Sequence, residues 1–375
     1  MSPLSLNHIR NSKMSIPKES NCFILNEKPR REVNYNLEDE HSTFKLIKKP
    51  LGELQEGQIL IKSLYLSNDP SQRAWIQKGL VADRMYTAPV NEGEPMRSTG
   101  LGMVIDSKDP NFKQGEVLNC DLKWADYVVI NKRDVFNKIP DADIPLTWYL
   151  DVLGFTGLTA YFGLLQVANL KKSDTIVISA ASGATGSMCI QIAKNIVGCK
   201  KVIGISGGPE KCKYVESIGA DICVDYRDPD LYNNMKKALG DDKYCDVFFD
   251  GVGGKVLDTM LNLTKPFGTV VACGTIAGYN DAKKSGIYSW GQIVTNRITV
   301  KGFIVLDFAK QYKKAIGEIL SWIKEGKIAV SKSSFTLIDL SAPEKFVKIP
   351  ETWGLLFSDS KGPGKLLTKI SDPKL

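Results

Sequence analysis

The sequence predicts an α/β protein, with a doubly wound parallel sheet and a smaller, discontinuous β-rich domain. The evidence lies in three patterns. A short apolar run, Thr175–Ser179, leads into a glycine turn and a helix-periodic segment. Further apolar runs alternate with helical sequence after that turn, as in a parallel sheet. Short apolar runs separated by turn residues fill the first part of the chain, and similar runs return at its end.

The amino-terminal part is predicted to be a partly open β-barrel, because short apolar runs are separated there by Gly, Asn, Asp and Pro. These runs are Gly57–Leu66, Thr99–Ile105, Glu116–Cys120 and Trp124–Ile130. Residues Leu146–Leu170 then have apolar side chains at helical spacing and predict a connecting helix.

The central part is predicted to form the parallel sheet. Its strands are expected at Thr175–Ser179, Val202–Ile205, Ile222–Val224, Val247–Phe249, Thr269–Cys273 and Thr299–Val305. After the first of them, Ala184, Met188, Ile192 and Ile196 fall on one helical face that is expected to pack on the sheet.

The last part of the chain predicts one more helix and a return to strands. An amphipathic helix is expected over Phe308–Lys327, with Ile316, Ile319, Leu320 and Ile323 on its apolar side. A strand at Lys365–Ile370 is expected to complete the amino-terminal lobe. The domain prediction is a flexible extension at 1–20, a β-rich domain at 21–150 and 329–375, and a nucleotide-binding domain at 151–328.

Composition excludes several classes of protein. The chain has 375 residues, of which 43% are hydrophobic and 24% charged, which is typical of a globular protein with a large core. No apolar segment is long enough to span a bilayer. The net charge of +7 is spread over short lysine clusters with no nucleic-acid motif, so neither nucleic acid nor a membrane is an expected partner. Residues 1–18 contain basic residues and no acidic residue. A weak organelle-targeting signal is therefore one open possibility, and a start of the protein at Met14 is another.

Cysteine and histidine usage argues for a reducing compartment and against zinc. The eight cysteines include no C-x-x-C pair, and several lie in apolar runs, as buried reduced thiols do. The only two histidines, His8 and His41, lie near the amino terminus. Because zinc sites need closely spaced Cys and His, a zinc alcohol dehydrogenase is disfavoured and no metal is expected.

The turn after Thr175–Ser179 is predicted to hold a dinucleotide pyrophosphate. It has the pattern A-x-G-x-x-G, with Ala181 where the first glycine is usual, followed by Gly183 and Gly186. Glycines allow backbone amides to approach the phosphates, and the next helix presents its positive end. A glycine turn that binds nothing is the plainer alternative, which the alternation of strands and helices around it disfavours.

The end of the second strand favours NADPH over NADH. An NAD site normally carries an acid there, whereas this chain has Ser206 followed by two glycines, with Lys211 just beyond. A lysine can bind the negatively charged 2′-phosphate of NADPH, whereas a carboxylate would repel it. Glu210 lies close by, and Lys211 as a merely exposed lysine is the alternative.

Two loops at carboxyl ends of sheet strands, Phe248–Gly254 and Ala272–Asn280, are further candidates for ligand contact. Tyr279 is the candidate catalytic residue among them. A phenol can donate a hydrogen bond to an oxygen that becomes negative as hydride adds to a conjugated system. Tyrosines at strand ends are also ordinary packing residues.

Taken together, these and other segments resemble the zinc-independent medium-chain reductases, specifically their prostaglandin reductase and alkenal double-bond reductase branch. Seven segments carry the resemblance in order: YLSNDPSQR (Tyr65–Arg73), GFTGLTAYFGL (Gly154–Leu164), AASGATGS (Ala180–Ser187), FFDGVGG (Phe248–Gly254), ACGTIAGYN (Ala272–Asn280), GFIVLDF (Gly302–Phe308) and GKLLTKI (Gly364–Ile370). The resemblance implies a GroES-like lobe, a Rossmann lobe, NADPH, a homodimer, and reduction of the C=C bond of α,β-unsaturated aldehydes and ketones. The expected location is the cytoplasm, a reducing compartment, with the nucleus left open as a second location.

The resemblance also implies site residues. Tyr279 would lie beside nicotinamide and substrate as the catalytic residue, with Tyr65 on the facing lobe. Lys211 would contact the 2′-phosphate and Tyr226 the adenosine. The remaining cofactor contacts are Ala181, Ser182, Gly183, Ala184, Thr185, Gly186, Ser206, Gly251, Val252, Gly274, Phe303 and Val305.

The chain departs from the family pattern at four positions. Gly251 and Gly362 stand where the family commonly has asparagine, and Ser71 and Gln72 replace a usual tyrosine and methionine. Each lost amide could remove a hydrogen bond worth about 1 kcal/mol. Two alternatives therefore stay open, an NADPH quinone reductase and an NADPH-binding protein without catalysis.

Overall fold

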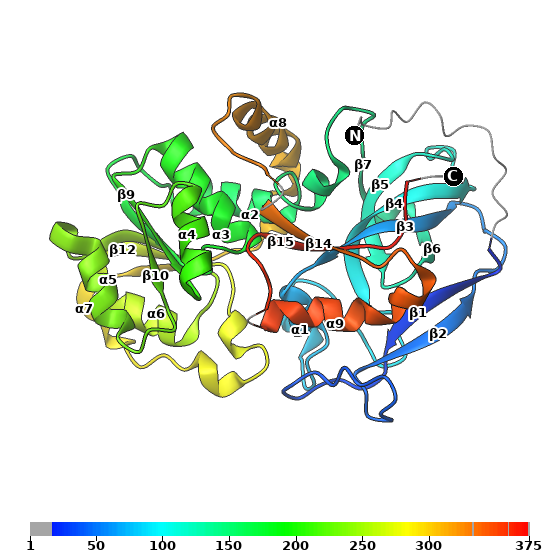
Figure 1. Cartoon of the computed structure of the whole chain (residues 1–375), viewed down its shortest axis with the longest axis horizontal. Helices are drawn as coiled ribbons and strands as arrows, with labels where there is room; N and C mark the ends of the chain where they lie inside the picture. Colours follow the sequence, from blue (N-terminus) through cyan, green and yellow to red (C-terminus); the bar gives the residue numbers. More distant parts are fainter. Residues whose placement is uncertain (1–16, 332–333, 359, 374–375) are drawn as a thin grey trace. The chain divides into compact units, whose positions relative to one another are not determined.

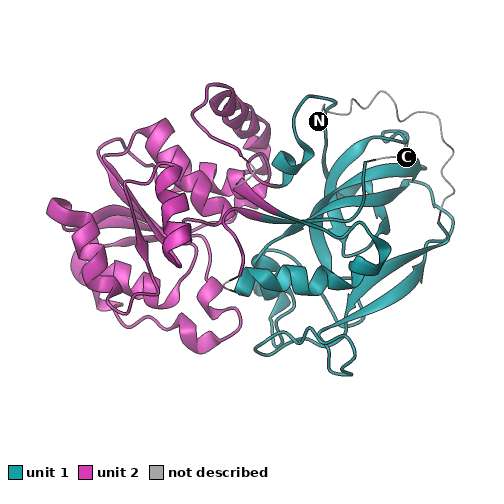
Figure 2. Ribbon diagram, viewed as in Figure 1, with its two compact units in different colours: residues 1–150, 337–358, 366–375 teal, residues 151–336, 359–365 magenta. Residues whose placement is uncertain are grey.

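The computed structural model describes residues 17–331, 334–358 and 360–373, and the chain divides into two compact units. Unit 1 comprises residues up to 150, 337–358 and residues from 366 onward, and unit 2 comprises 151–336 and 359–365 (Figure 2). Most of the predicted extension at 1–20 lies outside the described residues. Strand β1, Glu19–Leu25, begins inside it.

Unit 2 is built on a six-stranded parallel sheet (Figure 1). In spatial order its strands are β10 (Ile222–Asp225), β9 (Lys201–Ser206), β8 (Thr175–Ile178), β11 (Cys245–Asp250), β12 (Thr264–Ala272) and β13 (Thr299–Gly302). The four residues of β8 are all buried, because a central parallel strand is covered on both faces. Val177 packs in the core that includes side chains of the helices after β10 and β11, while Ile176 and Ile178 point to the opposite face.

Helices follow the strands of unit 2 in the alternation that the sequence predicts. They are α2 (Phe155–Phe162), α3 (Ala184–Gln191), α4 (Pro209–Ser217), α5 (Leu231–Leu239), α6 (Gly254–Leu261), α7 (Gly291–Asn296) and α8 (Tyr312–Lys324). Helices α2 and α3 pack on each other and continue as π-helical turns, Gly163–Val167 and Ile192–Val197. Because α3 contacts both the sheet and α2, its residues 186–191 are buried all round and not along one stripe.

Unit 1 is rich in β-structure, as predicted. A seven-stranded sheet has the order β14 (Phe335–Asp339), β15 (Lys365–Lys369), β3 (Gln58–Asn68), β4 (Arg97–Ser107), β5 (Val117–Lys123) and β7 (Val135–Lys138), with β6 (Tyr127–Asn131) also paired to β3. Strand β1 pairs with β2 (Phe44–Pro50), and the helices are α1 (Ser71–Trp75) and α9 (Ile349–Gly354). Since β15 pairs with β3, the end of the chain completes the amino-terminal lobe.

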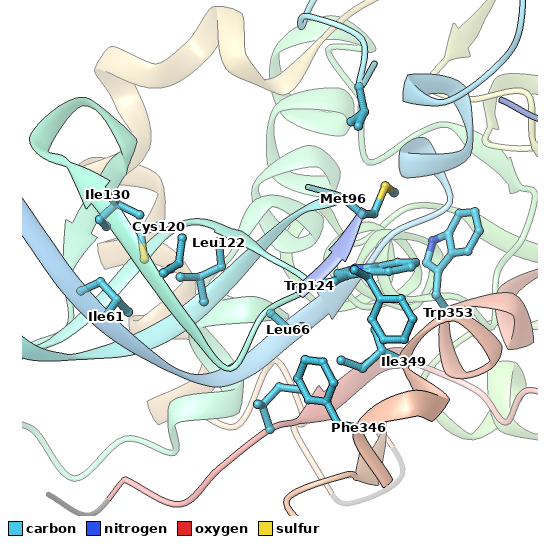
Figure 3. Packing of buried hydrophobic residues seen from close by; sticks show 14 of the residues in the cluster. Ile61, Leu66, Met96, Cys120, Leu122, Trp124, Ile130, Phe346, Ile349 and Trp353 are labelled. Atoms are coloured by element: carbon cyan, nitrogen blue, oxygen red, sulfur yellow. The ribbon is translucent and has the colours of Figure 1, made fainter. Parts of the chain in front are cut away.

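An aromatic core explains why the late segment belongs to unit 1. Trp353 of α9 is fully buried, and its ring centroid lies 5.7 Å from that of Trp124 (Figure 3). The Trp353 centroid also lies 6.0 Å from that of Phe44. Its indole Nε1 donates to the carbonyl oxygen of Asp69 at 3.2 Å. Burying an aromatic ring removes a large apolar area from water, so this contact fixes the end of the chain to its beginning.

Three predicted elements differ from the structure. The helix predicted over Leu146–Leu170 is broken after a 3₁₀ turn, Leu146–Leu150, and restarts at Phe155. The carbonyl oxygen of Asp151 there accepts from the amides of Gly154 (3.0 Å) and Gly157 (3.2 Å), which ends one element and begins the next. Sequence periodicity does not detect such a backbone turn.

The other two differences lie after β12. Strand β13 ends at Gly302 and not at Val305, and a 3₁₀ helix, Val305–Gln311, precedes α8. Helix α8 buries Ala315 and Ile319 most deeply. Trp322 stacks on Tyr161 of α2 with centroids 5.7 Å apart. The predicted apolar side is thus the packed one, since Ile319 is buried and Ile316, Leu320 and Ile323 are half-buried, and Ala315 and Trp322 widen it.

Candidate functional site: the carboxyl edge of the parallel sheet

The carboxyl ends of the strands in unit 2 meet at one edge of the sheet, where ligands of such folds bind. The turn after β8 lies at this edge. Ala180 adopts a left-handed backbone conformation (φ 47°), and its carbonyl oxygen accepts from the amide of Gly183 at 2.8 Å. This tight turn leads into α3, whose N-cap is Gly183. The positive end of α3 therefore adjoins the turn, as an anion site requires.

Gly186 is needed for this geometry. A Cβ on Gly186 would overlap the carbonyl oxygen of Ala180 and lie 2.7 Å from the Cα of Ala181. A Cβ on Gly183 would lie 3.1 Å from the same oxygen. The two glycines thus permit the close approach of helix and turn that a pyrophosphate cradle needs.

Hydrogen bonds connect the turn to two other segments. The Ser206 hydroxyl at the end of β9 donates to the Ser182 hydroxyl oxygen at 2.7 Å. The amide of Gly364 donates to the Ser182 carbonyl oxygen at 2.7 Å, and Gly183 forms a parallel bridge with Gly364. The structure therefore brings together the predicted turn residues and Ser206, and adds the segment 360–365. The family resemblance points to this segment only through Gly362, and nothing in its sequence pattern relates it to a turn about 180 residues earlier.

The predicted adenosine end lies where β9 and β10 end. The amide of Tyr226 donates to the Ser206 carbonyl oxygen at 2.9 Å, and the Tyr226 side chain is 46% exposed. A Cβ on Gly207 would lie 2.7 Å from the Tyr226 ring and 3.1 Å from Nε of Arg227. Arg227 is a basic residue at this place that sequence reasoning missed. Lys211 lies in the first turns of α4, which begins directly after Gly208.

The loops after β11 and β12 are fastened to each other and to the turn. Asp250 is buried, and its Oδ1 accepts from the amide of Val252 (2.9 Å) and from the Ser179 hydroxyl (3.0 Å). Ser179 Oγ accepts from the amide of Gly251 at 2.9 Å. The amide of Gly274 donates to the Asp250 carbonyl oxygen at 3.1 Å. Burial raises the pKa of Asp250, against the hydrogen bonds that it accepts.

Asp250 is thus a positioning residue that the sequence reading omitted. Its signal was present in the FFDGVGG segment, where an acid directly before a glycine-rich loop can accept from the backbone amides of that loop. It gathers the predicted cofactor residues Gly251, Val252 and Gly274 into one place.

Tyr279 follows a 3₁₀ turn, Ile276–Gly278, in the loop after β12. The amide of Ala277 in that turn donates to the Val252 carbonyl oxygen at 3.1 Å, which fixes the Tyr279 segment to the β11 loop. The Tyr279 side chain is half-buried. The structure therefore places Tyr279 at the same edge of the sheet as the phosphate turn.

Phe303 and Val305 lie just after β13 and contact helices of unit 2. The Phe303 ring lies against Gly163, and its centroid is 6.4 Å from that of Phe308. The Val305 carbonyl oxygen accepts from the Tyr312 hydroxyl at 2.9 Å. Tyr65 belongs to unit 1, on β3, where burial raises its pKa. The cofactor and substrate roles of these three residues stay predictions.

The residues at this edge fit a phosphorylated dinucleotide. In the turn after β8, a Cβ on Gly183 or Gly186 would occupy the space that the two glycines leave open. The end of β9 carries Ser206 and no carboxylate, and the cationic residues Lys211 and Arg227 lie nearby. In the part of the chain that the structure describes, no group of three or more His, Cys, Asp and Glu side chains is arranged to hold a metal ion. Nor does any helix there have the length and apolar character needed to cross a membrane.

Comparisons with known proteins agree with this geometry. Residues 30–138 match the family described as N-terminal domain of oxidoreductase, and residues 184–321 match the family described as zinc-binding dehydrogenase. The chain is 37% identical to the uncharacterized membrane protein YML131W of Saccharomyces cerevisiae, over 92% of this chain and 96% of that protein. It is 35% identical to the 2-alkenal reductase (NADP(+)-dependent) of Nicotiana tabacum, over 78% of this chain and 83% of that enzyme.

A solved structure extends the likeness to the whole fold. The crystal structure of CurA in complex with NADPH from Vibrio vulnificus superposes with a TM-score of 0.81 at 28% identity, covering 94% of this chain and all of that one (100%). The Rossmann and GroES-like fold predicted from the sequence is confirmed, and so is NADPH as the cofactor of this oxidoreductase. The chain belongs to the medium-chain dehydrogenase/reductase family, in its branch of prostaglandin reductases and NADPH-dependent alkenal reductases.

Proposed function

We propose that this protein uses NADPH to reduce the carbon–carbon double bond of α,β-unsaturated aldehydes and ketones. The observation that carries the proposal is the match to the 2-alkenal reductase over 83% of that enzyme's length. The site supports it, because a tyrosine hydroxyl lies on a loop that is tied to the proposed cofactor loops.

Bound NADPH would supply a hydride to the β-carbon of the alkene. The Ala181–Gly186 turn would hold the pyrophosphate and thereby fix the position of the nicotinamide. Tyr279 would donate a hydrogen bond to the carbonyl oxygen, where negative charge develops as the hydride arrives. The α-carbon would then take a proton from Tyr279 or from water. Tyr65 is proposed as the second residue that contacts substrate.

A substrate screen tests this function. We expect NADPH oxidation, followed at 340 nm, to be at least about tenfold faster in kcat/KM with a medium-chain 2-alkenal than with a simple quinone, because the chain is 35% identical to a 2-alkenal reductase. Turnover of quinones alone would identify the second candidate, a quinone reductase. NADPH binding without any turnover would identify a binding protein.

The quinone alternative remains to be tested because this chain has Gly251 where the family commonly has asparagine. A Cβ at this position would meet nothing within 4 Å, so there is room for the Cβ of the asparagine that is common in the family. A Gly251→Asn variant therefore serves as a second arm of the screen. If glycine sets substrate choice, the ratio of 2-alkenal to quinone turnover changes in this variant while its thermal unfolding does not.

We also propose that the protein is a homodimer in the cytoplasm, where its eight free cysteines would stay reduced. Strand β13 lies at the edge of the parallel sheet, and all four of its residues are exposed. Exposed apolar side chains on β13 and the preceding α7 include Val300 (46%) and Val294 (68%). An unpaired edge of this kind is suited to pairing with a second copy of the chain.

Sedimentation velocity tests the dimer. We expect the wild-type protein to sediment as a dimer and a Val300→Lys variant to shift toward monomer, because a buried, unpaired charge opposes association. A Val347→Lys variant, at an exposed valine of unit 1 (41%), serves as the control and should remain dimeric. A wild-type protein that sediments as a monomer would contradict the proposal.

A further inference from the structure

The segment 360–365 carries a lysine that the family resemblance did not single out. The segment is attached to the phosphate turn, because the amide of Gly364 donates to the Ser182 carbonyl oxygen and Gly364 bridges Gly183. Lys361 lies three residues before this attachment. Its Nζ donates to the carbonyl oxygens of Gly362 (2.9 Å) and Gly364 (2.6 Å), which orient the ammonium group from within the segment.

The charges around Lys361 are mostly of its own sign. Lys211 of α4 and Lys365 of β15 act on it as cations, and Asp151, before α2, is the carboxylate that opposes them. Burial first, and then the two neighbouring lysines, lower the pKa of Lys361 to about 8. A partly desolvated ammonium group that two other lysines repel and one carboxylate attracts favours the binding of an anion, which would offset both the desolvation and the repulsion.

We propose that Lys361 is a second lysine for the 2′-phosphate of NADPH, acting together with Lys211 and setting the preference for NADPH over NADH. This inference rests on the proposed NADPH-dependent function and on the 2′-phosphate contact that the family resemblance implies for Lys211. The 2′-phosphate is a compact anion with several acceptor oxygens, which two ammonium groups from different segments can share. Lys211 belongs to α4, and Lys361 belongs to the segment 360–365, which is paired with the phosphate turn.

Cofactor binding to the full-length protein tests the proposal. The dissociation constants for NADPH and for NADH are measured by nucleotide fluorescence. We expect Lys361→Gln to weaken NADPH binding about 30-fold, as the loss of one charged hydrogen bond does, and to change NADH binding less than about twofold. Lys361→Arg should retain most of the NADPH affinity. Lys237→Gln, at an exposed lysine of α5, is the charge-matched control and should match the wild type.

The contradictory outcomes are distinct. Equal weakening for both cofactors would overturn the proposal in favour of a pyrophosphate contact or a structural role in the turn. Unchanged NADPH affinity in the Lys211→Gln variant would contradict the proposal that Lys211 and Lys361 bind the 2′-phosphate together. Because no substrate is present, a failure to reduce enals would leave these results unaffected. Thermal unfolding shows whether Lys361→Gln is folded, and the pH profile of the wild type provides the test if it is not.

The pH profile follows from the lowered pKa. At pH 7 Lys361 is mostly protonated in the free protein and at about pH 8 it is half protonated, so NADPH affinity should fall by about twofold between pH 7 and pH 8. Above that range the lysine must take up a proton to engage the phosphate, and NADPH affinity should fall as pH rises. NADH affinity should not follow this fall, and Lys361→Arg should remove it, because a guanidinium stays charged. The same pH dependence for both cofactors would contradict the proposal.

Discussion

A Gly186→Val substitution is expected to weaken NADPH binding at least about 100-fold and to lower the free energy of unfolding by about 2 kcal/mol, within the range of overpacking effects. The added side chain would overlap the Ala180 carbonyl oxygen and crowd the Cα of Ala181 at 2.7 Å. Both are backbone atoms of the phosphate turn and cannot move without opening it. Helix α3 would therefore withdraw from the turn, and the amides there would no longer converge on a phosphate.

Two measurements check this prediction: NADPH affinity by fluorescence, and thermal or urea unfolding of the same preparation. The control is Gly317→Ala on α8, where a Cβ would meet nothing within 4 Å. Alanine in a helix interior is favoured over glycine by up to about 1 kcal/mol, so this variant should be as stable as the wild type or more stable, with unchanged NADPH affinity. A Gly186→Val protein that binds NADPH normally would show that the turn is not the cradle.

The elements that could be predicted from the sequence are those whose signal is local. Buried parallel strands such as Thr175–Ile178 consist of continuous apolar runs, and the glycine turn after β8 is defined by residues within one short segment. The break after Leu150 could not be predicted, since it depends on backbone hydrogen bonds to Asp151 and not on side-chain pattern. The apolar side of α8 could be predicted, since Ile319 is buried, but not the stacking of Trp322 on Tyr161, a contact between helices far apart in sequence.

The candidate site divides in the same way. Ala181, Gly183 and Gly186 belong to one motif and were found. Lys361 was not, because only the folded chain pairs its segment with the phosphate turn. Arg227 could not be predicted as a site residue from the sequence. It lies close to Gly207 only because β9 and β10 are paired and end side by side. Contacts between distant segments carry the information that sequence periodicity lacks.

Tyr279→Phe is expected to lower kcat for 2-alkenal reduction by about 100-fold, the usual effect of removing one donor to a developing oxyanion. The Tyr279 segment is held by the hydrogen bond from the Ala277 amide to the Val252 carbonyl oxygen, so the phenol has a fixed base from which to meet the substrate. Phenylalanine keeps the ring and removes only the hydroxyl. The fold and the KM for NADPH should therefore be unchanged.

Initial rates at saturating NADPH measure this effect, and Tyr244→Phe is the matched control. Tyr244 directly precedes β11, so it lies at the amino end of the strand, at the edge of the sheet opposite the proposed site, and it is 44% exposed. Its variant should keep the wild-type rate. A Tyr279→Phe enzyme that also keeps the full rate would assign carbonyl polarisation and the final proton to another group. A fall in NADPH affinity without a fall in kcat would make Tyr279 a cofactor contact alone, because a group that acts only as charge develops affects the transition state and not the binding of the cofactor.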